Sequence, residues 1–242
     1  MKLSSCWTGL CFGKKYFYFL FRIRELAIEH DLDRFYDLVD PLHEQDVYLV
    51  GDMGPYGTVH DRVLDARIVG VFDGITAYTW LDAGAQDQWR PAKKSGREIW
   101  TLVASYSRMV AGYCDEWKYW SELAADCGVN FVTPLCAGFS NRAPYESKEA
   151  YKEDWLVERT GRTSELFRKM CQKSTPIIEK SGTNVCLIDG WNEIHECSTL
   201  EPMVEHGFDY LDMVRDVFCD EPNSGWPPNV VPTRDGVRQY LA

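Results

Sequence analysis

The chain has 242 residues and a formal net charge of −11 at pH 7. This length suits a single large domain, and an α/β barrel is close to this size. The negative charge repels phosphate backbones and the sequence holds no basic patch, so a nucleic-acid partner is not expected.

Five apolar segments are predicted to be buried strands. Each is a continuous apolar run and not an alternating one, which is typical of parallel strands covered on both faces. In chain order they span residues 15–23, 46–52, 67–79, 130–139 and 184–191.

Helices are predicted between these strands, because apolar residues recur there at three- and four-residue spacing. The expected helices span residues 31–42, 98–114, 116–128, 162–180 and 207–218. Strands that alternate with helices indicate βαβ units and a parallel sheet. We therefore expect one α/β domain over residues 1–242.

The start of the chain does not predict a membrane anchor. Lys14 and Lys15 interrupt its apolar residues, and the run that follows is too short to span a bilayer, so neither a targeting segment nor a membrane span is expected. The nine cysteines include no CxxC pair, which argues against a zinc ribbon and favours a reducing, cytoplasmic compartment.

Polar and aromatic residues gather where the predicted strands end. Active sites of parallel α/β folds form at the carboxyl ends of strands, because the loops there converge. Tryptophan and tyrosine are abundant in this chain; they often line carbohydrate sites but are also ordinary core residues. The residues predicted at these ends are Asp52, Asp73, Tyr78, Trp80, Asn141, Arg142, Trp191, Asn192, Glu193, His195 and Glu196.

The spacing of Glu193 and Glu196 is the strongest indication of a catalytic site in the sequence. If the chain turns just after Asn192, positions three apart lie on one side, with Cβ atoms about 5–6 Å apart. Two carboxyl groups so placed can act on one sugar as acid and base. The glutamates could instead cap a following helix, or Glu193 could join His195 and His206 in a metal site.

The same segment carries a resemblance to a known family. "IDGWNEIHECSTLEP" followed by "GFDYLDMVRDVF" resembles the last strand and final helix of glycoside hydrolase family 99 and its WbsX-like relatives. "VTPLCAGFSNRAP" and "FDGITAYTW" are similar to two upstream strand ends of that family. The resemblance runs from about residue 46 to residue 218.

The resemblance implies a (β/α)8 TIM-barrel fold and retaining, endo-acting hydrolysis of α-mannosides or related glycans. Glu193 is matched to the base that acts on the sugar 2-hydroxyl, which gives a 1,2-anhydro sugar, and Glu196 to the acid and then base. No cofactor or metal is implied. The predicted substrate-binding residues are Asp73, Tyr78, Asn141, Arg142, Trp191, Asn192 and His195; all except Trp191, which is chosen for its place at a strand end, match the family's motifs.

Five strands are fewer than the eight of a closed barrel, so we expect an incomplete barrel that lacks its first strands. A partner could cover the open edge, which would otherwise expose unpaired backbone groups. The partner expected at the site is an oligosaccharide or polysaccharide substrate.

Two other functions stay open. One is a glycosyltransferase-like protein of polysaccharide biosynthesis, for which Asp31 and Asp33 form an Asp-x-Asp, although this pair also fits a helix cap. The other is a non-catalytic carbohydrate-binding remnant, which would keep the aromatic residues without needing both glutamates.

Overall fold

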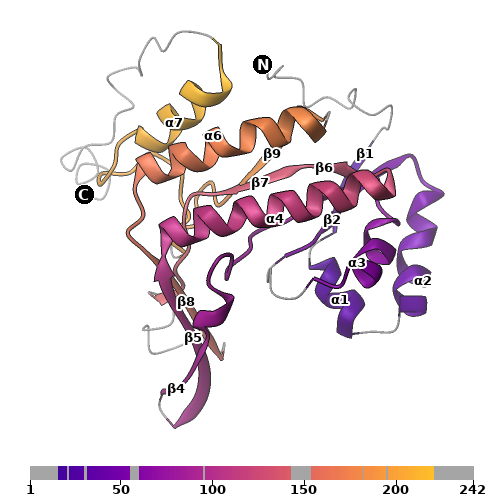
Figure 1. The fold of residues 1–242 in the computed structure, drawn as a ribbon, viewed down its shortest axis with the longest axis horizontal. Coiled ribbons are helices and arrows are strands. Elements are labelled where there is room, and N and C mark those ends of the chain that lie inside the picture. The colour runs from indigo at the N-terminus through magenta and orange to yellow at the C-terminus, as the bar shows by residue number, and fades with distance from the viewer. Residues whose placement is uncertain are drawn as a thin grey trace, which may run out of the picture.

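The computed structural model of the chain confirms a mixed α/β structure (Figure 1). It describes residues 16–20, 22–29, 32–54, 60–94, 96–142, 154–181, 183–194 and 196–220, with the backbone alone at residues 16–18, 25, 28, 29 and 94. Within this part of the chain, no helix has the length and apolar character needed to cross a bilayer.

All five predicted strand regions contribute parallel strands, which form a four-stranded sheet and an adjoining two-stranded sheet, together called the parallel sheet. The strands β1, β2, β3 and β6 are hydrogen bonded in this order, and β7 follows β6 after one residue and pairs in parallel with β9. The order in space therefore follows the order in the chain. Their bounds are β1 Tyr16–Leu20, β2 Val47–Asp52, β3 Gly74–Thr76, β6 Asn130–Phe131, β7 Thr133–Cys136 and β9 Cys186–Asp189.

The helices form a layer against this sheet. α3 packs on α4, α4 on α6 and α6 on α7, and Figure 1 shows α4 and α6 running side by side along β6 and β7. The predicted helices at residues 31–42, 162–180 and 207–218 are confirmed. The bounds are α1 Ile23–Glu29, α2 Leu32–His43, α3 Arg62–Val69, α4 Tyr106–Cys127, α6 Ser164–Ser181 and α7 Asp209–Phe218.

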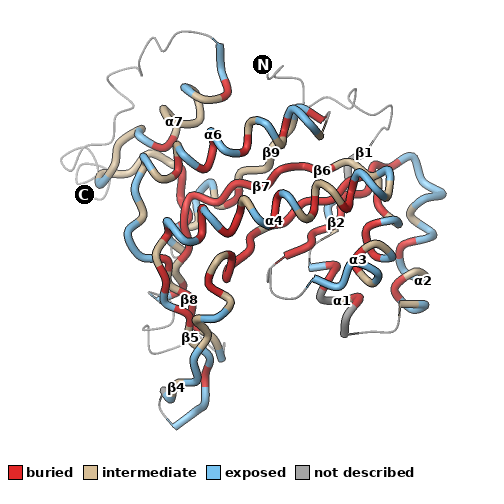
Figure 2. The backbone as a smooth tube through the Cα atoms, in the orientation of Figure 1, coloured by how far each residue is buried: buried red, intermediate tan, exposed pale blue. Residues whose placement is uncertain are grey.

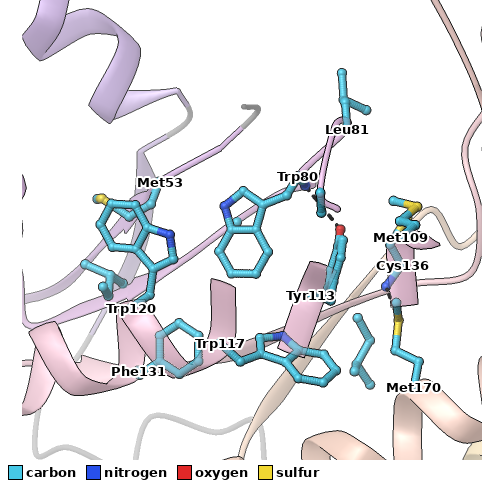
Figure 3. Packing of buried hydrophobic residues seen from close by; sticks show 14 of the residues in the cluster. Met53, Trp80, Leu81, Met109, Tyr113, Trp117, Trp120, Phe131, Cys136 and Met170 are labelled. Atoms are coloured by element: carbon cyan, nitrogen blue, oxygen red, sulfur yellow. Dashed lines mark hydrogen bonds between the residues drawn. The ribbon is translucent and has the colours of Figure 1, made fainter. Parts of the chain in front are cut away.

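The core lies between the sheet and this helical layer. Leu49, Ile75 and Leu135 of the strands are fully buried in one cluster with the helix residues, and Figure 2 shows buried backbone along β2 and β7 and at intervals along α4. Burial of such side chains contributes about 1.5–3 kcal/mol each. Figure 3 shows the aromatic centre of the cluster, where Trp80 meets Tyr113 of α4 with ring centroids 5.2 Å apart.

The strand predicted over residues 67–79 is wrong in its first half, because α3 continues to Val69 and β3 begins only at Gly74. The helix begins at a local signal that the apolar pattern concealed. Asp61 caps it, and its Oδ1 accepts hydrogen bonds from the backbone of Val63 and Leu64, both at 3.1 Å.

A second sheet was not predicted. It consists of β4 Arg90–Lys94, β5 Arg97–Ser105 and β8 Trp155–Thr160, with β4 antiparallel and β8 parallel to β5. A short 3₁₀ helix, η1 Gln86–Gln88, precedes it. The sheet combines the segments that follow β3 and β7 and projects away from that end of the parallel sheet (Figure 1).

The prediction of two helices at residues 98–114 and 116–128 is therefore wrong in its bounds. Residues up to Ser105 belong to a strand, and a single helix covers 106–127. Ile99 and Leu102 produced the misleading three-residue spacing. Both are buried, but on opposite faces of β5: Leu102 lies in the main core and Ile99 in a small cluster with Leu156.

Candidate functional site

Asp52 ends β2 and ties three strand ends together. Its Oδ2 accepts a hydrogen bond from the Arg22 backbone at 2.9 Å, and its Oδ1 accepts from Gly54 at 2.9 Å and from Tyr78 at 2.8 Å. Burial raises the pKa of Asp52, and these three N–H donors oppose that shift. The buried carboxyl group therefore fixes the backbone of Tyr78 after β3.

The loop after β9 closes on itself. We call residues 190–201 the glutamate loop. It leaves β9 at Gly190, whose φ of +75° suits glycine, and a Cβ there would lie 2.3 Å from Oγ of Ser198. The carbonyl of Trp191 accepts hydrogen bonds from the backbone of Leu200 at 3.1 Å and Glu201 at 2.9 Å. The two ends of the loop are thus joined.

Inside the glutamate loop the backbone turns directly after Asn192, as predicted. The backbone N–H of Ile194 donates to the Asn192 carbonyl at 2.8 Å, and that of Cys197 to the Ile194 carbonyl at 3.2 Å. Ser198 donates to the carbonyl of Glu193 at 3.2 Å. The segment is a tight turn and not the start of a helix, so helix capping does not explain the glutamates.

Glu193 and Glu196 are both half-buried, and both act electrostatically on Tyr78. Burial raises the pKa of the Tyr78 phenol well above its ordinary value, and the negative charges of Glu196, Asp189 and Glu193 raise it further. Tyr78 follows β3 whereas the glutamates follow β9. The fold therefore brings these three predicted residues into one electrostatic neighbourhood.

Asp189 is an acid of this neighbourhood that the sequence reasoning did not select. It is the last residue of β9, it is 6% exposed, and its Oδ1 has no hydrogen-bond partner within the described residues. Burial raises the pKa of Asp189 far above its ordinary range; hydrogen bonding to Cys136 and Thr79 opposes this, and the charge of Glu196 adds to it. The place of Asp189 at a strand end was the available signal in the sequence.

The segment after β7 lies against the glutamate loop. The backbone N–H of Ser140 donates to the carbonyl of Glu196 at 2.7 Å. The next residue, Asn141, is buried and faces β8: its Nδ2 donates to the Trp155 carbonyl at 3.3 Å and its Oδ1 accepts from the Val157 backbone at 2.8 Å. Asn141 therefore joins the two sheets, and its amide is engaged by backbone groups.

Arg142 and Asp73 also have structural partners. Nε of Arg142 donates to Glu158 of β8 at 2.8 Å, and its Nη2 reaches the same oxygen. Asp73 precedes β3 and so lies at the opposite end of that strand from Tyr78, where its Oδ2 accepts from the Leu49 backbone at 2.8 Å. The expectation that Asp73 lies at a carboxyl end was wrong, because β3 begins after it.

The remaining predicted residues flank the glutamates. Trp191 is 56% exposed and Asn192 is also exposed. An exposed tryptophan beside two carboxylates can cover the apolar face of a sugar. His195 lies outside the described residues. Ile194, which follows Glu193 directly, is 58% exposed.

The metal alternative has no support in the described structure. No group of three histidine, cysteine, aspartate or glutamate side chains lies close enough there to hold an ion. His206 packs against the ring of Tyr210 with centroids 4.8 Å apart, and burial lowers its pKa. The Asp-x-Asp of the transferase alternative consists of Asp31 and Asp33. Asp33 lies in the first turn of α2, and Asp31 is outside the described residues.

The sequence matches no protein-family model, and it matches no curated protein. The resemblance to glycoside hydrolase family 99 therefore stays a prediction.

Proposed function

We propose that the chain is a glycoside hydrolase-like protein that acts on α-mannosides or related glycans through Glu193 and Glu196. The observation that carries this proposal is the glutamate loop, whose turn after Asn192 holds the half-buried Glu193 and Glu196 and whose Glu196 carbonyl is bonded by Ser140 after β7. The charges of both glutamates also raise the pKa of Tyr78 after β3. Most retaining glycosidases use two carboxyl groups that flank the scissile glycosidic bond. The exposed ring of Trp191 supplies an apolar surface next to them.

In the proposed first step, Glu193 takes the proton of the sugar 2-hydroxyl while that oxygen attacks C1. Glu196 gives its proton to the departing glycosidic oxygen, and the bond from C1 to that oxygen breaks. A 1,2-anhydro sugar and a free alcohol result. Tyr78 keeps its phenol proton because of its raised pKa and can donate a hydrogen bond to a sugar oxygen.

In the second step, Glu196 takes a proton from water as the water oxygen attacks C1. The bond from C1 to O2 breaks, and O2 recovers its proton from Glu193. The two inversions at C1 give net retention. Each glutamate returns to its starting protonation state, so no metal or protein nucleophile enters the scheme.

The strand order supports an incomplete barrel of the (β/α)8 type as the scaffold. Neighbouring parallel strands follow the chain order, whereas a doubly wound sheet reverses its order at a switch point. The helices also pack on one another in sequence as one layer, as they do around a barrel. The described strands do not form a closed barrel.

The test is hydrolysis of α-mannan fragments by the unmodified chain and by Glu193→Gln and Glu196→Gln. Each change removes an acid–base group without changing its size, so we expect each to lower kcat by about 10²–10⁴-fold. Glu205→Gln, on an exposed residue beyond the loop, is the matched control and should retain activity. NMR of the first product should show the anomer of the substrate.

Other outcomes would replace the proposal. Full activity in both glutamine variants would exclude the two-glutamate mechanism. Turnover of a nucleotide sugar would favour the transferase. Glycan binding that neither substitution affects, without hydrolysis, would favour a binding protein that uses Trp191.

A further inference from the structure

Arg162 holds the backbone of the glutamate loop from outside. It lies between β8 and α6, and its Nη1 donates to the carbonyl of Cys197 at 2.8 Å. Its Nη2 donates to the carbonyl of Thr199. The planar guanidinium thus bonds two carbonyls of the segment that directly follows Glu196. Its donors are held in a rigid planar fork, which suits binding two acceptors at once.

Arg162 is itself held in place. Its guanidinium carbon lies 4.3 Å from the centre of the Tyr210 ring of α7, a cation–π distance. Its side chain also passes close to Gly138: a Cβ at Gly138 would lie 2.8 Å from Cδ of Arg162 and 3.1 Å from the Cys197 carbonyl oxygen. Gly138 has a φ of +151°, so both space and backbone conformation favour glycine there.

The carbonyl of Glu196 is fixed by a third contact, the 2.7 Å hydrogen bond from Ser140. Three successive anchor points therefore follow one another along the chain, at Glu196, Cys197 and Thr199, and Arg162 supplies two of them. Cys197 adopts a φ of +54°, which a non-glycine residue keeps only when its surroundings enforce it.

We propose that Arg162 is a positioning residue that fixes the positions of Glu193 and Glu196 relative to each other by holding the loop backbone. This inference rests on the proposed function, because it assigns to Arg162 the geometry of the Glu193 and Glu196 pair. Arg162 acts on catalysis without touching substrate. Its loss should therefore lower kcat more than it changes KM.

The variants are Arg162→Met, which removes the donors but keeps an apolar stem, and Arg162→Lys, which keeps the charge. The control is Arg168→Met. Arg168 lies in α6, the helix that begins just after Arg162. Its Nη2 forms an ion pair with Asp216 of α7 at 2.7 Å. The control weakens the packing of the same two helices and leaves the loop contacts in place.

Two readouts separate positioning from general stability. The first is kcat and KM on α-mannan fragments: Arg162→Met should lose about 100-fold in kcat, as expected for misplaced catalytic groups, with KM within about threefold, and Arg162→Lys should recover part of the loss. The second is amide hydrogen exchange, which should quicken at Ser198, Leu200 and Glu201 in Arg162→Met and stay unchanged there in Arg168→Met.

The proposal is overturned if Arg162→Met matches the control in kcat and in local exchange. It is also overturned if exchange quickens throughout the chain, because Arg162 would then be a general stabilising residue. If the unmodified chain cleaves no glycan but the local exchange effect is present, the proposed function fails, while the hold of Arg162 on the loop is supported.

Discussion

At the scale of single residues, burial divides the acids at the strand ends into two groups. Asp52 and Asp189 are buried and have raised pKa values, whereas Glu193 and Glu196 are half-buried at the loop. The sequence shows all four as acids after apolar runs. Desolvation, which only the packed structure determines, raises the pKa values of Asp52 and Asp189.

Asp189→Asn should stabilise the protein increasingly as the pH rises. The folded-state pKa of Asp189 is raised, so the folded state binds its proton more tightly than the unfolded state. The resulting stability is complete below the ordinary pKa of aspartate and is lost as the pH rises through the folded pKa. A tenfold difference in proton affinity between the two states corresponds to about 1.4 kcal/mol.

Thermal unfolding of both proteins between about pH 4 and pH 8.5 measures this difference. The gap in Tm should be smallest at the acid end and widen toward the alkaline end. Asp37→Asn, on an exposed face of α2, is the control and should show no such trend. A gap that does not change with pH would contradict a raised pKa of Asp189 in the folded state.

Tyr78→Phe tests the phenol whose pKa the charges of the glutamates raise. Under the proposed function, loss of one hydrogen bond to substrate or to a glutamate should lower kcat/KM by about tenfold. The ring is preserved, so Tm should change little. Tyr36→Phe removes a hydroxyl that donates to the Arg67 carbonyl at 3.3 Å between α2 and α3, and it should leave kcat/KM unchanged; equal kinetics of the two variants would remove Tyr78 from the site.

At the scale of elements, close backbone packing decides where α4 meets the loop after β3. Gly112 lies inside α4, where glycine costs about 1 kcal/mol relative to alanine. A Cβ at Gly112 would lie 2.1 Å from the Gly84 nitrogen and 2.4 Å from the carbonyl carbon of Ala83. The glycine is therefore required by the crossing, although local helix propensity opposes it.

Gly112→Ala should destabilise the protein by about 1–3 kcal/mol, because backbone atoms must move apart to admit the methyl group. The neighbouring exposed position gives the matched comparison. Ala111→Gly should cost about 1 kcal/mol through helix propensity alone. Urea unfolding of both variants measures the two values, and a stabilising Gly112→Ala would show that α4 does not cross the loop this closely.

At the scale of the whole molecule, Arg159 links the second sheet to the first. It is buried on β8, and its Nε and Nη2 donate to the Leu81 carbonyl at 3.0 and 2.7 Å, while Nη2 also donates to Ala83 at 2.9 Å. Burial lowers the pKa of Arg159 to about 10. The projecting sheet is therefore joined to the loop after β3 by buried polar contacts.

Arg159→Met should cost about 3 kcal/mol, since it leaves buried carbonyl groups without donors. Arg90→Met, on an exposed residue of β4, should cost less than about 1 kcal/mol. Because these contacts join the projecting sheet to the loop after β3, the unmodified protein should unfold in a single cooperative urea transition. Two separate transitions in the unmodified protein would show that the sheets are independent units.

The sequence by itself determined the features that depend on local pattern. The strand regions are continuous apolar runs, although the run at 67–79 concealed the end of α3. The helix α2 carries its own amphipathic pattern, and the turn considered after Asn192 lies directly after the apolar run of β9. Each of these signals lies within a few residues of the structure that it predicts. The same local signals placed Tyr78 and the glutamates at strand ends.

Only the tertiary structure decided which of these residues meet. The pairing of β5 with β8 joins segments about fifty residues apart, and it engages Asn141 and Arg142 in structural contacts. The burial that raises the pKa of Asp189 and the hydrogen bonds from Arg162 to the glutamate loop likewise come from segments distant in the chain. Desolvation and long-range hydrogen bonding are properties of packed neighbours, so no local pattern of residues could reveal them.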